Sequence, residues 1–265
     1  MGKEFKNIQQ VIDKLNSDGV NYLILRNYEC LLDDQIYVGG HEDIDFLCET
    51  SESIVNSLDA ISNRTREDNT HYHIFVGANR VNLDLRSVGD GYYCENWQRE
   101  MLKNKRGYNG FYVMSDEDYY YSLIYHAIFQ KKSFTEEYRH RLGEMSRMIG
   151  NPLEMFDRRH FIDDLCLYMK CKGYKFVYAE DPSIPLNFDG VDSKLVEVNL
   201  RRKCRCVFHH AKKNIIAQLV KIKRNIKDIC KKNTPPHIDS LAIVQGILKP
   251  QMSQPDLRNI CYVYG

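Results

Sequence analysis

The chain of 265 residues lacks any long apolar run, and this absence limits the kinds of protein that it can be. No window approaches the roughly 18 consecutive apolar residues that a membrane-spanning helix needs. The first residues also lack the apolar core of an export signal. With 43% hydrophobic and 28% charged residues, the composition is that of a globular protein with a packed core. We therefore expect a cytoplasmic protein.

The cysteines lack the spacing of a disulfide framework. Their number, nine, is odd and no CxxC pair occurs among them, so we expect reduced and mostly buried thiols. Four residues of types that bind metals do lie close together in the sequence. A CxC followed by two histidines, however, lacks the paired loop spacing of known zinc sites. These residues are Cys204, Cys206, His209 and His210. The cysteine pattern therefore disfavours both a cross-linked fold and a structural zinc.

The chain has almost no net charge, yet its charges are unevenly placed. Residues 201–232 contain twelve basic residues and one acid, Asp228, which gives this segment a charge of +11. Because the net charge is +1, the rest carries −10. Apolar residues recur at helical spacing among the cations, as in a helix on an anionic membrane surface. Nucleic acid is less favoured because the segment lacks interleaved aromatics, and packing against the acidic remainder is the third interpretation.

The order of hydrophobic patterns predicts an α+β fold. A helix at 6–17 is followed by strands at 20–26 and 43–48, and Ser51 is the expected cap of the next helix. Two further strands flank a turn at 77–79. Helices follow from Ser115 onward, at 135–149, at 157–172 and through the basic segment. We predict a core at 1–114, a helical region packed on it at 115–190, and a basic helical arm with a C-terminal tail at 191–265.

Three aspartates are the candidates for chemistry. Asp43 and Asp45 stand at i and i+2 of one strand, so both side chains project from the same face. Like charges this close require a cation, and Mg²⁺ suits oxygen ligands. Asp84 alternates with Leu83 and Leu85 on a later strand and joins the pair if the two strands are neighbours. Such a cluster suits phosphoryl-type transfer. The alternative is that Asp43 and Asp45 are merely solvated side chains at the edge of a strand.

This order of elements resembles the nucleotidyltransferase superfamily. Five stretches also resemble uncharacterised nucleotidyltransferase-like proteins associated with bacterial surface polysaccharide synthesis, namely residues 22–28, 41–46, 81–85, 91–93 and 125–131. The resemblance implies a small mixed sheet with flanking helices, followed by a mostly helical C-terminal region. It also implies that Asp43, Asp45 and Asp84 bind Mg²⁺ or Mn²⁺, and that Asp84 helps to deprotonate an acceptor hydroxyl.

One departure from that family concerns the donor. The usual Gly-Ser turn after the first strand is absent; Arg26-Asn27 stands in its place, and Gly39-Gly40 comes just before the aspartates. An arginine binds phosphate with its planar fork, so another pyrophosphate-bearing donor, such as phosphoribosyl pyrophosphate, becomes credible beside a nucleoside triphosphate. The candidate donor-binding residues are Arg26, Asn27, Gly40, Arg86 and Lys131. Either arginine can equally be a surface ion pair.

Other polar residues admit two interpretations each. His71 and His73 share a strand face. They are either catalytic groups or a solvent-facing contact between strands. His126 precedes Lys131 on one helix, where a cation near the C-terminus also fits the helix dipole. Asp181 before Pro182 orients an acceptor hydroxyl or serves turn chemistry alone.

The sequence thus predicts a metal-dependent transferase that moves a nucleotidyl or phosphoribosyl-type group from a phosphorylated donor to a saccharide, polyol or lipid-linked acceptor. Its expected location is the cytoplasm, with peripheral attachment to the inner face of the membrane as an option. Two alternatives stay open at this point. One is a small-molecule or antitoxin-type nucleotidyltransferase, and the other is a non-catalytic scaffold that binds membrane or polyanion through the basic arm.

Overall fold

The computed structural model describes residues 4–32, 43–63, 70–131, 133–151, 156–186, 188–197 and 199–233, with side chains described up to residue 225. Gly40, one of the predicted donor-binding residues, lies outside these ranges. The chain divides into two compact units, residues 1–211 and 212–265. The first unit holds the sheet and most helices, and the predicted boundaries at 114 and 190 stay predictions.

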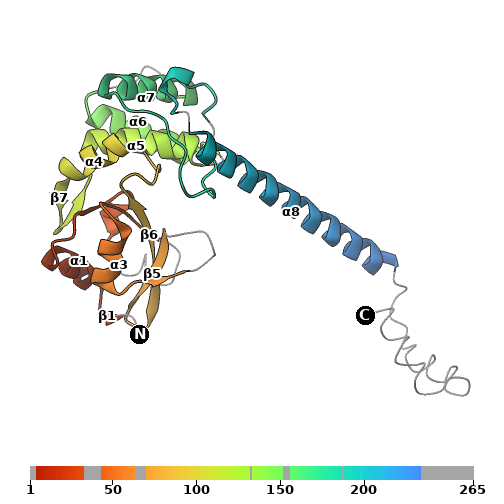
Figure 1. Ribbon diagram of the computed structural model, residues 1–265, viewed down its shortest axis with the longest axis horizontal. Helices are drawn as coiled ribbons and strands as arrows, with labels where there is room; N and C mark the ends of the chain where they lie inside the picture. The colour runs from red at the N-terminus through yellow and green to blue at the C-terminus, as the bar shows by residue number, and fades with distance from the viewer. Residues whose placement is uncertain are drawn as a thin grey trace, which may run out of the picture. The chain divides into compact units, whose positions relative to one another are not determined.

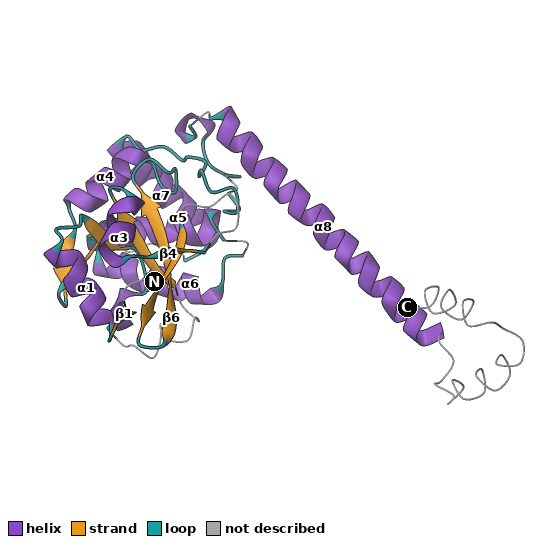
Figure 2. Ribbon diagram, turned by 60° about the horizontal axis from the view of Figure 1, so that its bottom comes forward, coloured by secondary structure: helices purple, strands orange, loops and turns teal. Residues whose placement is uncertain are grey.

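The described strands form one mixed sheet of eight strands (Figure 2). Their order is β1-β5-β6-β3-β2-β8-β7, and β4 pairs with β5 outside this path. β6 is parallel to β3 and antiparallel to β5, whereas β2 is antiparallel to β3. The strands are β1 (Glu4–Phe5), β2 (Tyr22–Ile24), β3 (Asp43–Cys48), β4 (Ile61–Ser62), β5 (His71–Val76), β6 (Asn79–Ser87), β7 (Arg106–Tyr108) and β8 (Phe111–Val113).

The alternation along β3 and β6 separates an apolar face from a polar one. Ile44 and Phe46 on β3 and Leu83 and Leu85 on β6 are buried. Because successive side chains of a strand point to opposite faces, the aspartates between them lie on the other face. Register fixes their positions along the sheet, since Asp45 is paired with Asp84.

Seven α-helices occur in the described ranges: α1 (Ile8–Ser17), α3 (Ser51–Leu58), α4 (Glu95–Lys103), α5 (Asp116–Phe129), α6 (Glu136–Met148), α7 (Arg158–Lys172) and α8 (Leu200–Asn233). Side-chain caps begin several of them, and Asn7, Ser115, Thr135 and Asp157 accept hydrogen bonds from the first turns of α1, α5, α6 and α7. The predicted cap Ser51 is wrong by one residue. Thr50 has the extended cap conformation, and Ser51 is the first helical residue of α3.

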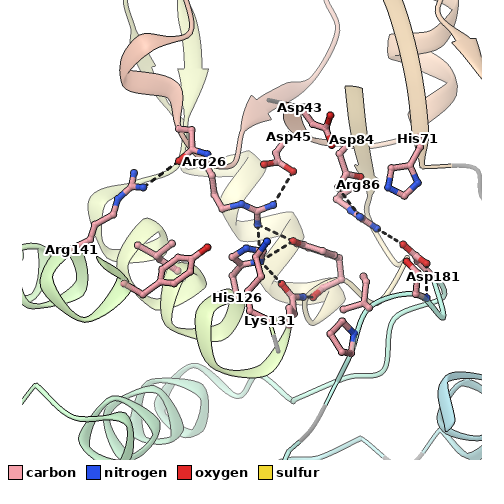
Figure 3. Close-up of a pocket in the computed structure, with 18 residues that line it drawn as sticks. Arg26, Asp43, Asp45, His71, Asp84, Arg86, His126, Lys131, Arg141 and Asp181 are labelled. Carbon is pink, nitrogen blue, oxygen red and sulfur yellow. Dashed lines mark hydrogen bonds and ion pairs between the residues drawn. The ribbon is translucent and has the colours of Figure 1, made fainter. Parts of the chain in front are cut away.

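Helix α5 is the buried centre of the helical layer. Twelve of its 14 residues, Asp118 to Phe129, are buried, and a helix that is buried on all sides must be covered by other elements. It packs against α6 and α7, which lie beside it in Figure 1. The C-terminal end of α5 faces the carboxylates of β3 and β6, as Figure 3 shows.

The predicted α+β class is confirmed at the level of a mixed sheet with helices packed around it. Patterning missed β1, β4, α4, β7 and β8 in the first half of the chain. Two 3-10 turns, at Tyr28–Cys30 and Ser193–Leu195, also went unpredicted. No helix in the described ranges combines the length and the apolar character that crossing a membrane requires.

Candidate active site

The three predicted aspartates meet at one cavity of about 370 Å³. Asp43 and Asp45 reach it from β3, and Asp84 reaches it from the neighbouring strand β6 (Figure 3). Asp43 is exposed and Asp84 is buried, with Asp45 between them in exposure. Every predicted site residue in the described ranges lines this cavity, namely Arg26, Asn27, Asp43, Asp45, Asp84, Arg86 and Lys131.

Arg26 neutralises one of the carboxylates. It follows β2, which pairs with β3, and its Nη2 donates to Asp45 Oδ1 at 2.8 Å. Its Nη1 donates to the hydroxyl of Tyr92, also at 2.8 Å. Burial opposes the charge of the Arg26 guanidinium, but Asp45 and Tyr92 together hold its pKa well above the usual value. The side chain of Arg26 is 9% exposed and has fixed partners, unlike an arginine in a fully solvated ion pair.

Arg86 has the same relation to Asp84. Its Nη2 donates to Asp84 Oδ2 at 2.7 Å, and its Nη1 lies 3.5 Å from Asp181 Oδ2. The guanidinium carbon lies 4.4 Å from the centre of the Tyr92 ring, within the range of a cation–π contact. Burial opposes the positive charge here as well, yet Asp84 and Tyr92 raise the pKa of Arg86. The fold thus brings Asp181 from the chain after α7 to this site.

The arginines leave one carboxylate oxygen at the cavity without a hydrogen-bond donor among the described residues. Asp84 Oδ1 is buried and has no hydrogen-bond partner among the described residues. Burial raises the pKa of Asp45 to about 6; Arg26 opposes this rise and the nearby Asp84 adds to it. A buried carboxylate oxygen without a donor is costly. The site therefore has the electrostatic property that an added cation or a proton relieves.

A neutral histidine stands behind Arg26. His126 Nδ1 lies 3.2 Å from both Arg26 Nη1 and the Tyr92 hydroxyl, and 3.1 Å from Gln130 Oε1. Burial, followed by the charge of Arg26, keeps the pKa of His126 well below its ordinary value. Gln130 also donates to the backbone carbonyl of Tyr92 at 2.8 Å. This network from α5 and the loop after β6 positions the Arg26 fork.

Cations form another part of the rim. Lys131 lies just beyond the C-terminal end of α5, and Arg141 reaches the cavity from α6. Arg141 Nη1 donates to Asn27 Oδ1 at 3.2 Å and also contacts Glu29. Asn27 has a φ of 55°, in the left-handed region where asparagine is favoured among the residues with a Cβ. A cavity with carboxylates on one side and cations on another suits a ligand that carries both a metal ion and phosphates.

The two predicted strand histidines separate in the structure. His71 stands across from Asp84 in the β5–β6 pairing and lines the cavity. His73 lies further along β5, where its ring contacts Asn63. Only the first is placed to act at the carboxylates.

Patterning missed several lining residues, including Tyr92, Gln130, Tyr138 and Arg141. Tyr92 falls in one of the stretches that carry the family resemblance, but nothing local to that stretch indicates a contact with two arginines. Arg141 is one of several polar residues on an amphipathic helix. These positions depend on how distant segments pack, which periodicity does not report.

The carboxylates at the cavity are ligands of the type that a divalent metal ion prefers. Their present spacing, however, is not that of a formed metal centre. Within the described ranges, no three or more His, Cys, Asp or Glu side chains are grouped closely enough to hold a metal ion. The available ligands are carboxylate oxygens, which Mg²⁺ and Mn²⁺ prefer. The buried Asp84 Oδ1, which has no partner among the described residues, is the observation that favours a cation.

Comparison with known proteins adds little to this geometry. No protein-family model matches the chain, and no curated protein matches it. Among solved structures, JHP933 from Helicobacter pylori matches with a TM-score of 0.34 and 13% sequence identity. The match covers 82% of this chain and 95% of that one. A TM-score this low supports no inference about fold or function.

Proposed function

We propose that this protein is a metal-dependent transferase of nucleotidyltransferase-like fold. It moves a nucleotidyl or phosphoribosyl-type group from a pyrophosphate-bearing donor to a saccharide or polyol hydroxyl in surface polysaccharide synthesis. The proposal rests on one observation above all. Asp45 and Asp84 stand side by side on parallel strands at a cavity, and a buried oxygen of Asp84 has no partner in the described part of the chain.

Asp43, Asp45 and Asp84 are the residues that would hold Mg²⁺ or Mn²⁺. Such an ion neutralises charge that develops on the transferred phosphate and orients the donor. Asp43 is exposed at the mouth of the cavity, whereas Asp84 is buried within it. The set therefore reaches from solvent into the site.

Arg26, Arg86, Lys131 and Arg141 are the donor-binding residues in this proposal. The two buried guanidinium groups are held in fixed directions by Tyr92 and by carboxylates. Both terminal nitrogens of each guanidinium have these partners in the structure, so binding two oxygens of one phosphate requires the guanidinium to exchange its carboxylate for the donor. Lys131 and Arg141 on the rim suit the more distal phosphates of the same donor.

Asp84 is the proposed proton acceptor. An acceptor hydroxyl that reaches the carboxylates can pass its proton to Asp84 Oδ1, the oxygen that Arg86 does not occupy. General-base action requires a lone pair within hydrogen-bond reach of the hydroxyl. The Nδ1 of His126 is not suited to this role because Arg26, Tyr92 and Gln130 surround it.

The arginine pairs favour a second candidate, a non-catalytic scaffold. Asp45 and Asp84 each already have a cationic partner, at 2.8 Å and 2.7 Å. If those pairs persist whenever a ligand is present, the carboxylates cannot bind a metal ion. The two candidates therefore differ in whether Mg²⁺ changes the protein.

Thermal unfolding of the full chain distinguishes them. With Mg²⁺ and a panel of nucleoside triphosphates and phosphoribosyl pyrophosphate, one donor at about 100 times its dissociation constant should raise the midpoint by roughly 5 °C or more. The rise should need Mg²⁺ and should disappear in Asp45→Asn. Asp163→Asn, an exposed carboxylate on α7, is the matched control and should keep it.

Each variant is compared with its own midpoint without ligand, so a change in basal stability does not confuse the result. A metal-dependent rise that Asp45→Asn retains would contradict the assignment of the carboxylates. The absence of any rise with every donor would favour the scaffold.

A further inference from the structure

Figure 1 shows the course of helix α8. An apolar stripe lies on a solvent-exposed face of this helix. Six large apolar side chains on it are between 53% and 74% exposed, namely Leu200, Val207, Phe208, Ile215, Leu219 and Ile222. At about 100° per residue, they fall within one sector of roughly 120° around the helix axis. Exposure of this many large apolar side chains on one side of a helix indicates a binding surface.

The first turns of α8 show that another face of the helix packs on the protein. Arg202 Nη2 donates to Glu180 Oε1 at 2.7 Å and to the Gly89 carbonyl at 3.0 Å. Cys206 is 3% exposed, and His210 Nε2 lies 3.1 Å from the Ile184 carbonyl. Arg202, Cys206 and His210 are spaced by four residues, so they share a face. That face lies opposite the apolar stripe, so the contacts that anchor the helix leave the stripe exposed.

The charge around the stripe is of one sign. The side chains described from residue 200 to residue 225 include nine cations and no acid. The cations are Arg201, Arg202, Lys203, Arg205, Lys212, Lys213, Lys221, Lys223 and Arg224. A second copy of the helix would bring like charges together without the acidic neighbours that stabilise helix pairs. A nucleic acid would match the charge and leave the apolar stripe in water.

We propose that α8 lies along an anionic membrane surface. Its apolar stripe enters the boundary between headgroups and acyl chains, and its lysines and arginines contact the negative headgroups. Unlike a second copy or a nucleic acid, an anionic lipid surface is complementary to both the stripe and the charge. The proposal is independent of the chemistry at the carboxylates, because it rests only on α8 and the residues that anchor it.

Vesicle flotation with the full chain tests this proposal. Vesicles containing phosphatidylglycerol should carry the protein upward, whereas vesicles of phosphatidylcholine alone should not, and salt should weaken binding because it screens the charges. Ile215→Gln with Leu219→Gln should reduce the bound fraction more than tenfold. The matched control is Ile216→Gln with Val220→Gln, the same kind of change about 100° further around the helix, where side chains are also exposed.

Circular dichroism of both double variants establishes that helix content is unchanged before binding is compared. Equal loss in the two double variants would overturn the stripe as the membrane-binding face. Equal flotation with phosphatidylcholine alone would overturn the role of anionic lipid. A sedimentation mass of two chains that falls to one in the stripe variant, without any vesicle binding, would identify a second copy as the partner and contradict the proposal.

Discussion

Asp45 and Asp84 each face their own arginine, and Tyr92 lies between those arginines. The Tyr92 hydroxyl accepts from Arg26, and its ring faces Arg86. A single side chain thus holds both guanidinium groups in position. Since His126 and Gln130 contact the same tyrosine, loss of any member of this group is expected to disturb the direction of Arg26.

His126 gives a prediction about acid stability. It is buried beside Arg26, with Lys131 and Arg86 adding positive charge, and its pKa lies well below the ordinary 6.5. Below pH 6.5 the unfolded chain therefore binds a proton that the folded protein does not. The stability of the fold decreases as the pH is lowered, until the pH reaches the depressed pKa of His126. Between pH 6.5 and 5.5 the variant His126→Gln should lose about 1 kcal/mol less stability than the wild type.

Urea unfolding at several pH values measures this difference, because other titrating groups contribute to both proteins and cancel. His140→Gln, an exposed histidine on α6, is the control and should follow the wild type. Identical slopes for His126→Gln and the wild type would contradict a neutral buried His126.

The position of Asp43 and Asp45 on one face of β3 could be predicted from the two-residue period of a strand, and the structure agrees. The sequence predicts that Asp84 joins Asp43 and Asp45 only if its strand lies beside theirs, because the sequence does not show which strands are neighbours. Tyr92 and Arg141 could not be placed at all. Their functions depend on the approach of loop and helix to the sheet, which no local pattern encodes.

At the scale of elements, Asp118 joins three helices. Its Oδ1 accepts from Trp97 Nε1 on α4 at 2.9 Å and from the Tyr168 hydroxyl on α7 at 3.0 Å. Its Oδ2 accepts from the Ser115 hydroxyl that begins α5. Asp118, Trp97 and Tyr168 are all buried, and Asp118 and Tyr168 also line a cavity beside α4 and α7.

Asp118→Ala should therefore destabilise the fold by about 2–5 kcal/mol, since it leaves buried donors of Trp97 and Tyr168 unpaired. Asp118→Asn keeps one carbonyl acceptor and should cost clearly less. Chemical denaturation of both variants measures the order. Asp163→Ala on the exposed side of α7 serves as the control and should remain near the wild type. Equal losses for the alanine and asparagine variants would contradict the hydrogen-bond account.

The elements with clear caps and periodicity were predictable. Ser115 and Thr135 mark the starts of α5 and α6 as expected. Helix α4 was missed because its nine residues mix buried Trp97 and Met101 with charges at short intervals. β7 and β8 have three residues each, too few for alternation to distinguish a strand from a loop.

At the scale of the whole molecule, charge is divided along the chain. The segment 201–232 carries +11 and the rest carries −10. This division follows from the sequence alone, whereas the orientation of the apolar stripe on α8 required the contacts of Arg202, Cys206 and His210. The vesicle experiment and the donor experiment therefore test separate parts of the account, and failure of one leaves the other standing.

The most direct test of the central claim is diffraction from crystals grown with Mn²⁺ and the donor that raises the unfolding midpoint. Mn²⁺ accepts the same oxygen ligands as Mg²⁺ and scatters anomalously. We expect an anomalous peak for Mn²⁺ at coordination distance from carboxylate oxygens of Asp45 and Asp84. The guanidinium of Arg26 should have turned to a phosphate of the donor. Donor bound in the cavity with no peak there, and with Arg26 and Arg86 still paired to both aspartates, would contradict the claim.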